Sequence, residues 1–474
     1  MKTLFDHRAK IICTIGPASE DENVLRKLIQ SGMDIARLNF SHGSHQDHLQ
    51  KMERIRKISK ELGKPVAILQ DLQGPKIRIG KFKEPPIQLK PGDLFTITTR
   101  KVLGDQHQVS TTYKNLPHDV QPDDTILVND GLIKLRVKSK TESDVLCEVV
   151  NGGSLYDRRG INLPGVKISE PSLTEKDKQD VMFGLEHGID YVALSFVRDA
   201  KSVLDLRNFM GKRAVPIIAK LEKPEALENL DAIIDAADGV MVARGDLGVE
   251  ISSEKVPSVQ KTIIEKCLLK NKPVITATQM LDSMMVHPIP TRAEATDVAN
   301  AIFDGSDAVM LSGETAFGDY PIESVRTMNS IIKESEKHRQ FFRINPDDRL
   351  ENTLHDFSTS ICHSAYHSAH EINARFIVVL TRSGFTALKM SNFRPEAPIL
   401  ALTSNLQTYR RMALYWGVIP LFIEKEIFMS EDLNDLEQVL RQSNWIQSGD
   451  RLVIVAGSSR RQGGTNLLRL HEVS

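Results

Sequence analysis

The sequence predicts an α/β protein in three parts: a (β/α)8 TIM barrel, a small β-barrel lid domain inserted into it, and a C-terminal α/β domain. Three observations support this fold class. The chain has 474 residues, a length typical of about three domains. Short apolar or β-branched runs alternate with amphipathic stretches of helical length, and eight such units precede a polar segment at 343–349. One long interruption of this alternation, and a second alternating region near the end, account for the other two parts.

The barrel is predicted from eight strands, each followed by a stretch that can form a helix. The candidate strands are 10–15, 34–38, 65–70, 191–195, 216–220, 239–243, 273–278 and 307–311. Helices are expected, for example, at 21–30, 224–236 and 292–303. Eight consecutive βα units are typical of a closed parallel barrel.

The inserted domain follows the third strand, where short strands replace the βα alternation. These strands are 96–99, 125–128, 134–137 and 145–150, and turn signals such as Pro91-Gly92-Asp93 separate them. After the barrel, strands at 375–380, 398–403, 418–423 and 451–456 flank helices and indicate a doubly wound unit. The expected domain segments are 1–74 and 171–342 for the barrel, 75–170 for the lid and 343–474 for the C-terminal domain.

Composition excludes several classes of protein. The 61 Lys and Arg residues balance 62 Asp and Glu residues without a long single-sign block, so nucleic-acid binding has little support. The start has no apolar core of a secretory signal, and no apolar run approaches the length of a membrane span. Four scattered cysteines suit a reducing compartment better than a disulfide framework. A cytoplasmic protein with no membrane partner is therefore expected.

Polar residues gather where the predicted barrel strands end, which is the face on which barrel enzymes carry their active sites. The i, i+2 spacing of Lys220 and Glu222 points both side chains to one face of an extended segment. Glu222 and Asp246 could hold a hard divalent cation, while Lys220 and Arg37 would meet negative oxygens of a substrate. This pattern favours phosphoryl transfer.

A purely structural reading stays open for each of these residues alone, because Lys220 and Glu222 could form a simple salt bridge and loop acids often cap helices. For the whole ring of polar strand ends that reading is weaker, because the ring would cost stability without a ligand. Dinucleotide, Walker and serine-hydrolase motifs are not found in the sequence.

Seven strings of the sequence are similar to those of the pyruvate kinase family: 13–17, 37–43, 71–78, 218–222, 241–250, 276–284 and 310–316. The resemblance covers essentially the whole chain. It implies transfer of a phosphoryl group from phosphoenolpyruvate to ADP, giving pyruvate and ATP in the last step of glycolysis. It also implies a homotetramer.

The resemblance assigns a role to each matching position at the barrel mouth. Lys220 matches the lysine that acts on the transferring phosphoryl group, and Arg37 matches an arginine on the phosphate. Glu222 and Asp246 match the ligands of Mg2+, with Mn2+ left open because both metals accept oxygen ligands. Gly245, Asp246 and Thr278 match contacts to the enolpyruvate part. The hydroxyl of Thr278 is expected to order a water relay for protonation of the enolate.

Nucleotide positions implied by the resemblance are Asn39, Phe40, Ser41, His42, Arg78 and, on the lid, Arg159. Arg159 replaces a frequent lysine and so keeps the charge but not the geometry. Members that need K+ bind it near residues matching Asn39, Ser41, Asp71 and Leu72. They carry a glutamate where this chain has Lys76, whose ammonium could replace K+.

A hydroxyl-rich turn in the C-terminal domain resembles the family's effector phosphate loop, with Thr381, Arg382, Ser383, Gly384 and Thr386 as candidate contacts. Phe385 replaces an arginine common there, so a sugar phosphate and AMP both remain candidate effectors. A second basic loop is expected at 460–464.

Two other functions remain open: a phosphometabolite sensor that has lost turnover, and a Mg2+-dependent aldol lyase acting on pyruvate or phosphoenolpyruvate. The inserted lid argues against the lyase, and the filled catalytic positions argue against the sensor. His42, His45 and His48 have helical spacing, and a polar helix surface is expected for them rather than a metal site.

Overall fold

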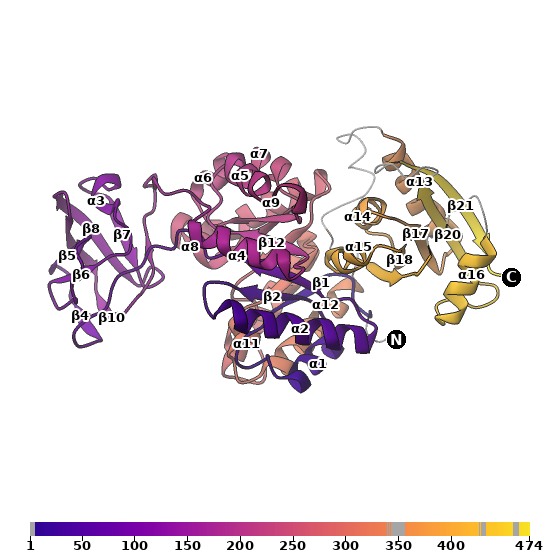
Figure 1. The fold of residues 1–474 in the computed structure, drawn as a ribbon, viewed down its shortest axis with the longest axis horizontal. Helices are drawn as coiled ribbons and strands as arrows, with labels where there is room; N and C mark the ends of the chain where they lie inside the picture. The colour runs from indigo at the N-terminus through magenta and orange to yellow at the C-terminus, as the bar shows by residue number, and fades with distance from the viewer. Residues whose placement is uncertain are drawn as a thin grey trace.

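The computed structural model describes residues 5–338, 340, 342, 356–425, 427, 433–457 and 464–474. Three bodies lie in a row, with the β domain at one end, the barrel in the middle and the C-terminal domain at the other end (Figure 1). The predicted linker 343–349 and most of the predicted loop 460–464 lie outside the described residues.

The barrel is closed by eight parallel strands in the order β1-β16-β15-β14-β13-β12-β3-β2, which confirms the predicted (β/α)8 fold. The strands are β1 Lys10–Thr14, β2 Met33–Asn39, β3 Ala67–Asp71, β12 Tyr191–Leu194, β13 Ile217–Leu221, β14 Gly239–Ala243, β15 Val274–Ala277 and β16 Ala308–Leu311. Apolar side chains including Ile12, Ile218 and Met241 fill the interior. The strands therefore surround a packed core, and chemistry is left to their ends.

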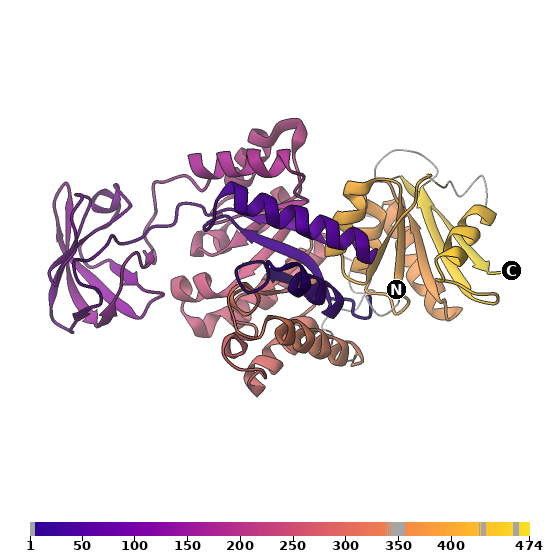
Figure 2. The same ribbon diagram turned by 60° about the horizontal axis from the view of Figure 1, so that its bottom comes forward.

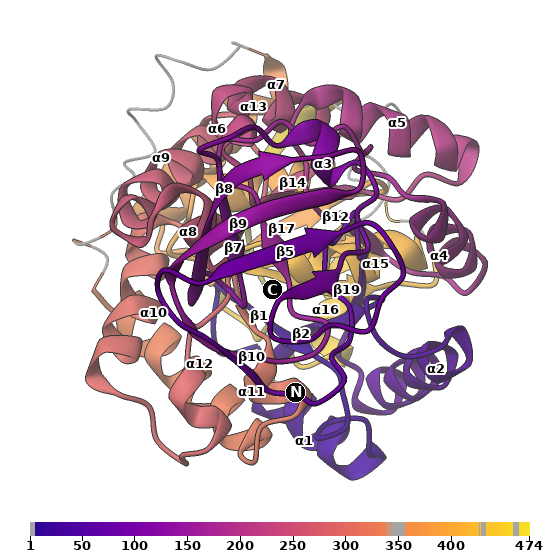
Figure 3. The same ribbon diagram turned by 90° about the vertical axis from the view of Figure 1, so that its left-hand side faces the viewer.

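Helices surround the barrel, as the view down its axis shows (Figure 3). They are α1 Glu22–Ser31, α2 His45–Leu62, α4 Glu175–Glu186, α5 Ala200–Met210, α6 Pro224–Glu228, α7 Leu230–Ala236, α8 Arg244–Ile251, α9 Val256–Leu269, α10 Arg292–Asp304, α11 Gly313–Ala316 and α12 Pro321–Glu336. Short 3-10 turns η2 Gly211–Arg213, η3 Ser253–Lys255 and η4 Asp282–Met285 accompany them.

The prediction of one helix over 224–236 is wrong, because α6 and α7 are separated at Asn229. The side-chain amide of Asn229 donates to the carbonyls of Glu225 and Arg198, both at 3.0 Å. Asparagine side chains compete with the helical ladder for backbone groups in this way, so the helix restarts after this residue.

The lid leaves the barrel after β3 and returns before α4 along two chain segments (Figure 2). It contains β4 Ile87–Leu89, β5 Leu94–Thr98, β6 Gln108–Ser110, α3 Leu116–Asp119, β7 Thr125–Val128, β8 Ile133–Lys140, β9 Asp144–Asn151, β10 Gly153–Leu155 and β11 Ile161–Asn162. Strands β4, β6, β10 and β11 were not predicted, because each has only two or three residues.

The lid sheet has six strands in the order β11-β7-β8-β9-β5-β6. Residues Arg78 and Ile79, in the segment that follows β3, connect its two edge strands. Arg78 bridges Gly160 beside β11, and Ile79 bridges Thr111 beside β6. The segment that leaves the active-site strand β3 therefore becomes part of the lid wall.

The C-terminal domain is a five-stranded sheet in the order β19-β18-β17-β20-β21. Its elements are α13 Phe357–Glu371, β17 Phe376–Leu380, α14 Phe385–Asn392, β18 Ile399–Thr403, α15 Leu406–Arg411, η7 Met412–Leu414, β19 Val418–Phe422, α16 Leu433–Gln442, β20 Arg451–Gly457 and β21 Thr465–Glu472. The antiparallel edge strand β21 was not predicted, because most of its residues are at least partly exposed and it lacks an apolar run.

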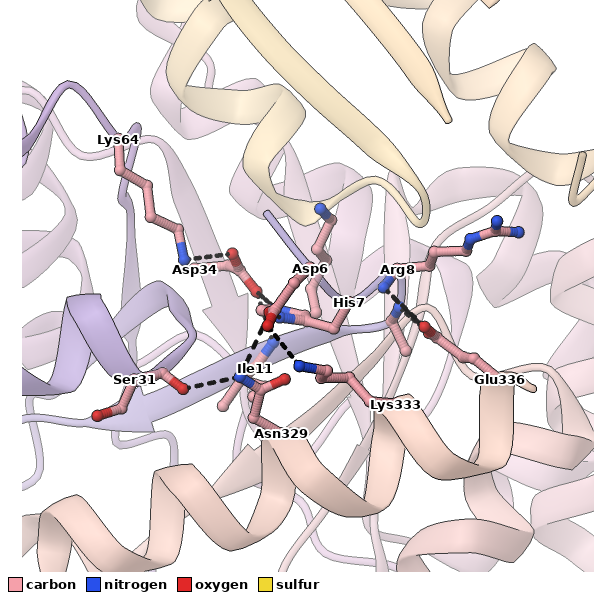
Figure 4. Close-up of polar contacts among 12 residues, drawn as sticks. Asp6, His7, Arg8, Ile11, Ser31, Asp34, Lys64, Asn329, Lys333 and Glu336 are labelled. Carbon is pink, nitrogen blue, oxygen red and sulfur yellow. Dashed lines mark hydrogen bonds and ion pairs between the residues drawn. The ribbon is translucent and has the colours of Figure 1, made fainter. Parts of the chain in front are cut away.

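The barrel and the C-terminal domain share a buried junction. Ala413 and Leu414 of η7 belong to the core inside the barrel, and Lys10 Nζ donates to the carbonyl of Val418 at 2.9 Å. Beside this contact Asp34 lies between His7 and Lys64 (Figure 4). Among the described helices, none combines the length and apolar character needed to cross a membrane.

Candidate active site

Four charged side chains form one cluster at the C-terminal ends of β2, β3 and β13. Arg37 Nε donates to Asp71 Oδ2 at 2.6 Å, and its Nη1 donates to the hydroxyl of Thr14 at 2.9 Å. Lys220 Nζ lies 3.2 Å from Asp71 Oδ1 and 2.9 Å from Glu222 Oε1. The two predicted cations are therefore held about one buried carboxylate, Asp71.

This arrangement fixes the protonation of the cluster. Burial lowers the pKa of Lys220, but Asp71 and Glu222 outweigh it and raise that pKa above its ordinary value. Burial raises the pKa of Asp71, but Lys220 and Arg37 bring it below its ordinary value. Lys220 is thus a permanent cation at neutral pH.

Unlike Asp71, Glu222 lies in surroundings that favour its protonated form. Its pKa is raised by burial and by the negative charge of Asp246, although Lys220 opposes this shift. A cation between Glu222 and Asp246 would offset both the cost of burying the Glu222 charge and the repulsion between the two carboxylates. Among the described residues there is no group of three or more His, Cys, Asp or Glu side chains around one point. Two carboxylates suit Mg2+, which commonly completes its shell with water and substrate oxygens.

Thr278 and Gly245 form a second wall of the mouth. The amide of Gly245 donates to Thr278 Oγ1 at 2.7 Å, and that hydroxyl donates to the carbonyl of Ala277 at 2.6 Å. Thr278 has φ +71°, a strained conformation for a β-branched residue. Arg244 Nη2 supports this turn by donating to the carbonyl of Thr278 at 2.7 Å.

The predicted nucleotide residues divide between the barrel and the lid. Asn39 Oδ1 accepts from the amide of Ser41 at 3.1 Å, which folds the loop after β2. Burial lowers the pKa of His42, and the charges of Arg78, Lys76 and Arg37 lower it further. Three cations therefore act on His42 at the end of this loop, which suits the binding of an anion.

Arg78 and Arg159 have partners within the lid itself. Arg78 Nη1 donates to the carbonyl of Arg158 at 3.0 Å. The Arg159 guanidinium lies 5.4 Å from the centre of the Tyr156 ring. Neither arginine has an ion-pair partner among the described carboxylates.

The positions of the predicted monovalent-cation region also have protein partners. Asp71 binds Arg37 and Lys220, and the carbonyl of Leu72 accepts from Ser195 Oγ at 2.7 Å. Lys76 lines a pocket between lid and barrel, together with Asn162, Phe196, Lys223 and Asp246. In the described part of the chain no carboxylate lies within ion-pair distance of Lys76.

Sequence reasoning assigned no role to two residues that position the site, Ser195 and Arg244. Ser195 Oγ accepts from Lys220 Nζ at 2.8 Å and so completes the surroundings of that ammonium. Both residues stand at ends of predicted strands, and this placement was the only signal for them. Glu314, another polar strand end, binds the amides of Leu281 and Ser312 instead.

The predicted effector loop is a turn into α14. Thr381 Oγ1 accepts from the amide of Gly384 at 3.0 Å, and Thr408 Oγ1 donates to the carbonyl of Arg382 at 2.8 Å. Ser383 is exposed. Thr386 is buried, and its hydroxyl lies 2.6 Å from that of Thr465 on β21. The structure therefore separates Thr386 from the other candidates.

A TIM barrel with an inserted lid and a mouth of paired cations and carboxylates suits a phosphotransferase. Family models agree: "Pyruvate kinase, barrel domain" matches residues 6–325 and "Pyruvate kinase, alpha/beta domain" matches residues 359–471. The chain belongs to the pyruvate kinase family.

Curated relatives named pyruvate kinase support this membership. The protein of Staphylococcus saprophyticus is 46% identical over 472 residues, which cover 98% of this chain and 80% of the relative. That of Geobacillus stearothermophilus is 45% identical over 476 residues, and that of Staphylococcus aureus MRSA252 is 44% identical over 471 residues, with the same coverage. The chain is therefore a glycolytic phosphotransferase and not an aldol lyase.

Proposed function

We propose that the protein transfers a phosphoryl group from phosphoenolpyruvate to ADP at the mouth of the barrel, giving pyruvate and ATP. The observation that carries this proposal is the position of Lys220 Nζ, within 3.2 Å of oxygens of Ser195, Asp71 and Glu222. Its fixed positive charge suits a reaction in which negative charge spreads over phosphoryl oxygens. Arg37 adds a second cation for the substrate phosphate.

Glu222 and Asp246 would hold Mg2+, or Mn2+ in its place. When bound, the metal supplies a hard positive charge for substrate oxygens. Burial, and after it the negative charge of Asp246, raise the pKa of Glu222, and a cation between the two carboxylates would offset both effects. Lys220, which already contacts Asp71 and Ser195 besides Glu222, would remain beside that metal as a cation for the substrate.

Thr278 would order a water that protonates the enolate carbon. Its hydroxyl hydrogen is already donated to the carbonyl of Ala277, and one lone pair accepts from Gly245. One lone pair is left to accept from a water. This geometry supports a relay through water rather than direct donation by the hydroxyl.

Lys76 would supply the charge that K+ provides in other members, so that K+ is not required. Support comes from its place in the pocket beside Asp246 and from its effect on the pKa of His42. ADP would lie between the loop 39–42 and the lid arginines Arg78 and Arg159.

The turn into α14 in the C-terminal domain would bind a regulatory phosphate compound. A sugar phosphate or AMP would bind at Thr381 to Gly384, and equilibrium binding of each compound tests this. We also propose that the protein is a cytoplasmic homotetramer. The proposed domains are the barrel, 1–74 and 171–342, the lid, 75–170, and the C-terminal domain, 343–474.

The decisive experiment measures pyruvate formation from phosphoenolpyruvate, ADP and Mg2+, with and without K+. Turnover by the wild type is expected, with a loss of about a thousandfold in kcat for Lys220→Met. Lys266→Met is the matched control, because exposed Asp231 is the only described residue with which Lys266 forms an ion pair. No turnover in either buffer would instead favour the sensor that has lost its activity.

A further inference from the structure

The loop after β2 is held from outside at two of its backbone carbonyls. Lys176 Nζ, from the first turn of α4, donates to the carbonyl of Phe40 at 2.7 Å. His48 Nε2, from the first turn of α2, lies 2.9 Å from the carbonyl of His42. A carbonyl only accepts, so His48 Nε2 carries the hydrogen.

His48 is not the surface residue that its helical spacing predicted, because only 3% of it is exposed. Its ring stacks on Phe40 with centroids 3.9 Å apart and planes 9° from parallel. Burial is the main cause that lowers its pKa, so the ring stays neutral with one hydrogen. Nδ1 has no hydrogen-bond partner among the described residues. Within this part of the chain, the bond to the loop is thus the only hydrogen bond of this imidazole.

Lys176 is itself held in place, although half of its side chain is exposed. Its ammonium pairs with Asp180 Oδ2 at 2.6 Å, and the other oxygen of this buried carboxylate binds His45 at 2.7 Å. Asp177, which follows Lys176 in the chain, accepts from the amide of Gly74 at 3.1 Å. One turn of α4 therefore fixes both the loop and the segment that enters the lid.

We propose that Lys176 and His48 are positioning residues for ADP, which they do not touch. They hold the carbonyls of Phe40 and His42 and so fix the loop of Asn39 to His42, whose His42 senses the charges of Arg37, Lys76 and Arg78. This inference rests on the proposed function, since it takes the loop as part of the nucleotide site. It adds two residues that no matching motif of the sequence assigns.

Two substitutions at residue 48 separate the hydrogen bond from the ring stack. His48→Phe keeps an aromatic ring on Phe40 and removes the donor. His48→Gln removes the ring and keeps an amide nitrogen at the place of Nε2. Lys176→Met removes the second donor, and Lys178→Met is its matched control, because the one ion pair of Lys178 with a described residue is that with exposed Glu175 on the same helix.

The experiment measures KM for ADP and for phosphoenolpyruvate, the calorimetric affinity for ADP, and the melting temperature of each variant. For His48→Phe and Lys176→Met, KM for ADP is expected to rise about tenfold with KM for phosphoenolpyruvate changed less than about twofold. His48→Gln is expected to restore most of the loss, and Lys178→Met to match the wild type.

Unchanged KM for ADP in His48→Phe and Lys176→Met overturns the inference and leaves the proposed function standing. An equal rise of both KM values, or a lower melting temperature with both KM values unchanged, also overturns it, because either result describes a merely structural role. If the wild type neither turns over phosphoenolpyruvate with ADP nor binds ADP, the proposed function fails and the inference fails with it.

Discussion

The imidazole Nε2 of His7 lies 2.8 Å from Asp34 Oδ2, with both side chains almost fully withdrawn from solvent. Lys64 Nζ approaches the other oxygen of Asp34 at 3.1 Å, and the amide of Ile11 in β1 donates to Oδ2 at 3.0 Å. Asp34 thus joins the first two strands to the junction with the C-terminal domain (Figure 4).

Asp34→Asn is expected to lower the free energy of unfolding by about 3 kcal/mol, because it leaves the buried cations of His7 and Lys64 without their counter-charge. Urea denaturation followed by circular dichroism measures the change. Lys333→Met is the control: its partner Asp6 is part-exposed, and surface pairs contribute less than about 1 kcal/mol. Equal effects of the two substitutions would contradict the prediction.

Stability should fall as the pH rises above neutrality, because of His7. Burial lowers its pKa, but Asp34 and Asp6 outweigh burial and raise the pKa above the ordinary 6.5, against the opposing charge of Lys64. A raised folded-state pKa gives stability that is complete below pH 6.5 and lost as the pH passes through the folded value. The melting temperature is expected to drop by about 3 °C across that window.

His7→Gln should remove this part of the pH dependence, since glutamine does not titrate. Thermal melts of both proteins between about pH 6 and 9 compare the slopes. Asp34 acts in the opposite range: burial raises its pKa, but Lys64 and His7 lower it below the ordinary 3.8, so its contribution disappears only as the pH falls through acid values. An unchanged alkaline slope in His7→Gln would show that another group causes it.

Lys76→Glu is expected to create a requirement for K+, because it replaces the ammonium by a carboxylate in the pocket beside Asp246. Turnover without K+ should fall at least about tenfold, and added K+ should restore it. Lys83→Glu makes the same charge change on the exposed surface of the lid, where Lys83 pairs with Asp105, and should have no such effect. A wild type that already needs K+ would refute the proposed role of Lys76.

Thr278→Ala is expected to slow protonation of the enolate about a hundredfold, while Thr278→Ser keeps the hydroxyl and most of the rate. The measurement is exchange of solvent deuterium into the methyl group of pyruvate, followed by NMR. Exchange at the wild-type rate in Thr278→Ala would exclude a part for the hydroxyl in the proton route.

The local pattern of the sequence was sufficient to predict the barrel, the inserted domain and the C-terminal sheet, because residues close together in the chain specify each βα unit. It also placed Lys220 and Glu222 on one face, since alternation along a strand is a local property. Short strands such as β6 and the polar edge strand β21 were not predicted, because they are defined by their pairing partners and not by apolar runs in the sequence.

By itself, the sequence determined the family, the order of the domains and the residues at the mouth of the barrel. Only the tertiary structure decided how these residues are held. Arg37 and Lys220 share the carboxylate of Asp71 because separate strands pack side by side. The hydrogen bond from Lys176 to the carbonyl of Phe40, 136 residues earlier in the chain, depends on packing in the same way. No local pattern encodes such contacts, because they form only when closure of the barrel brings distant segments together.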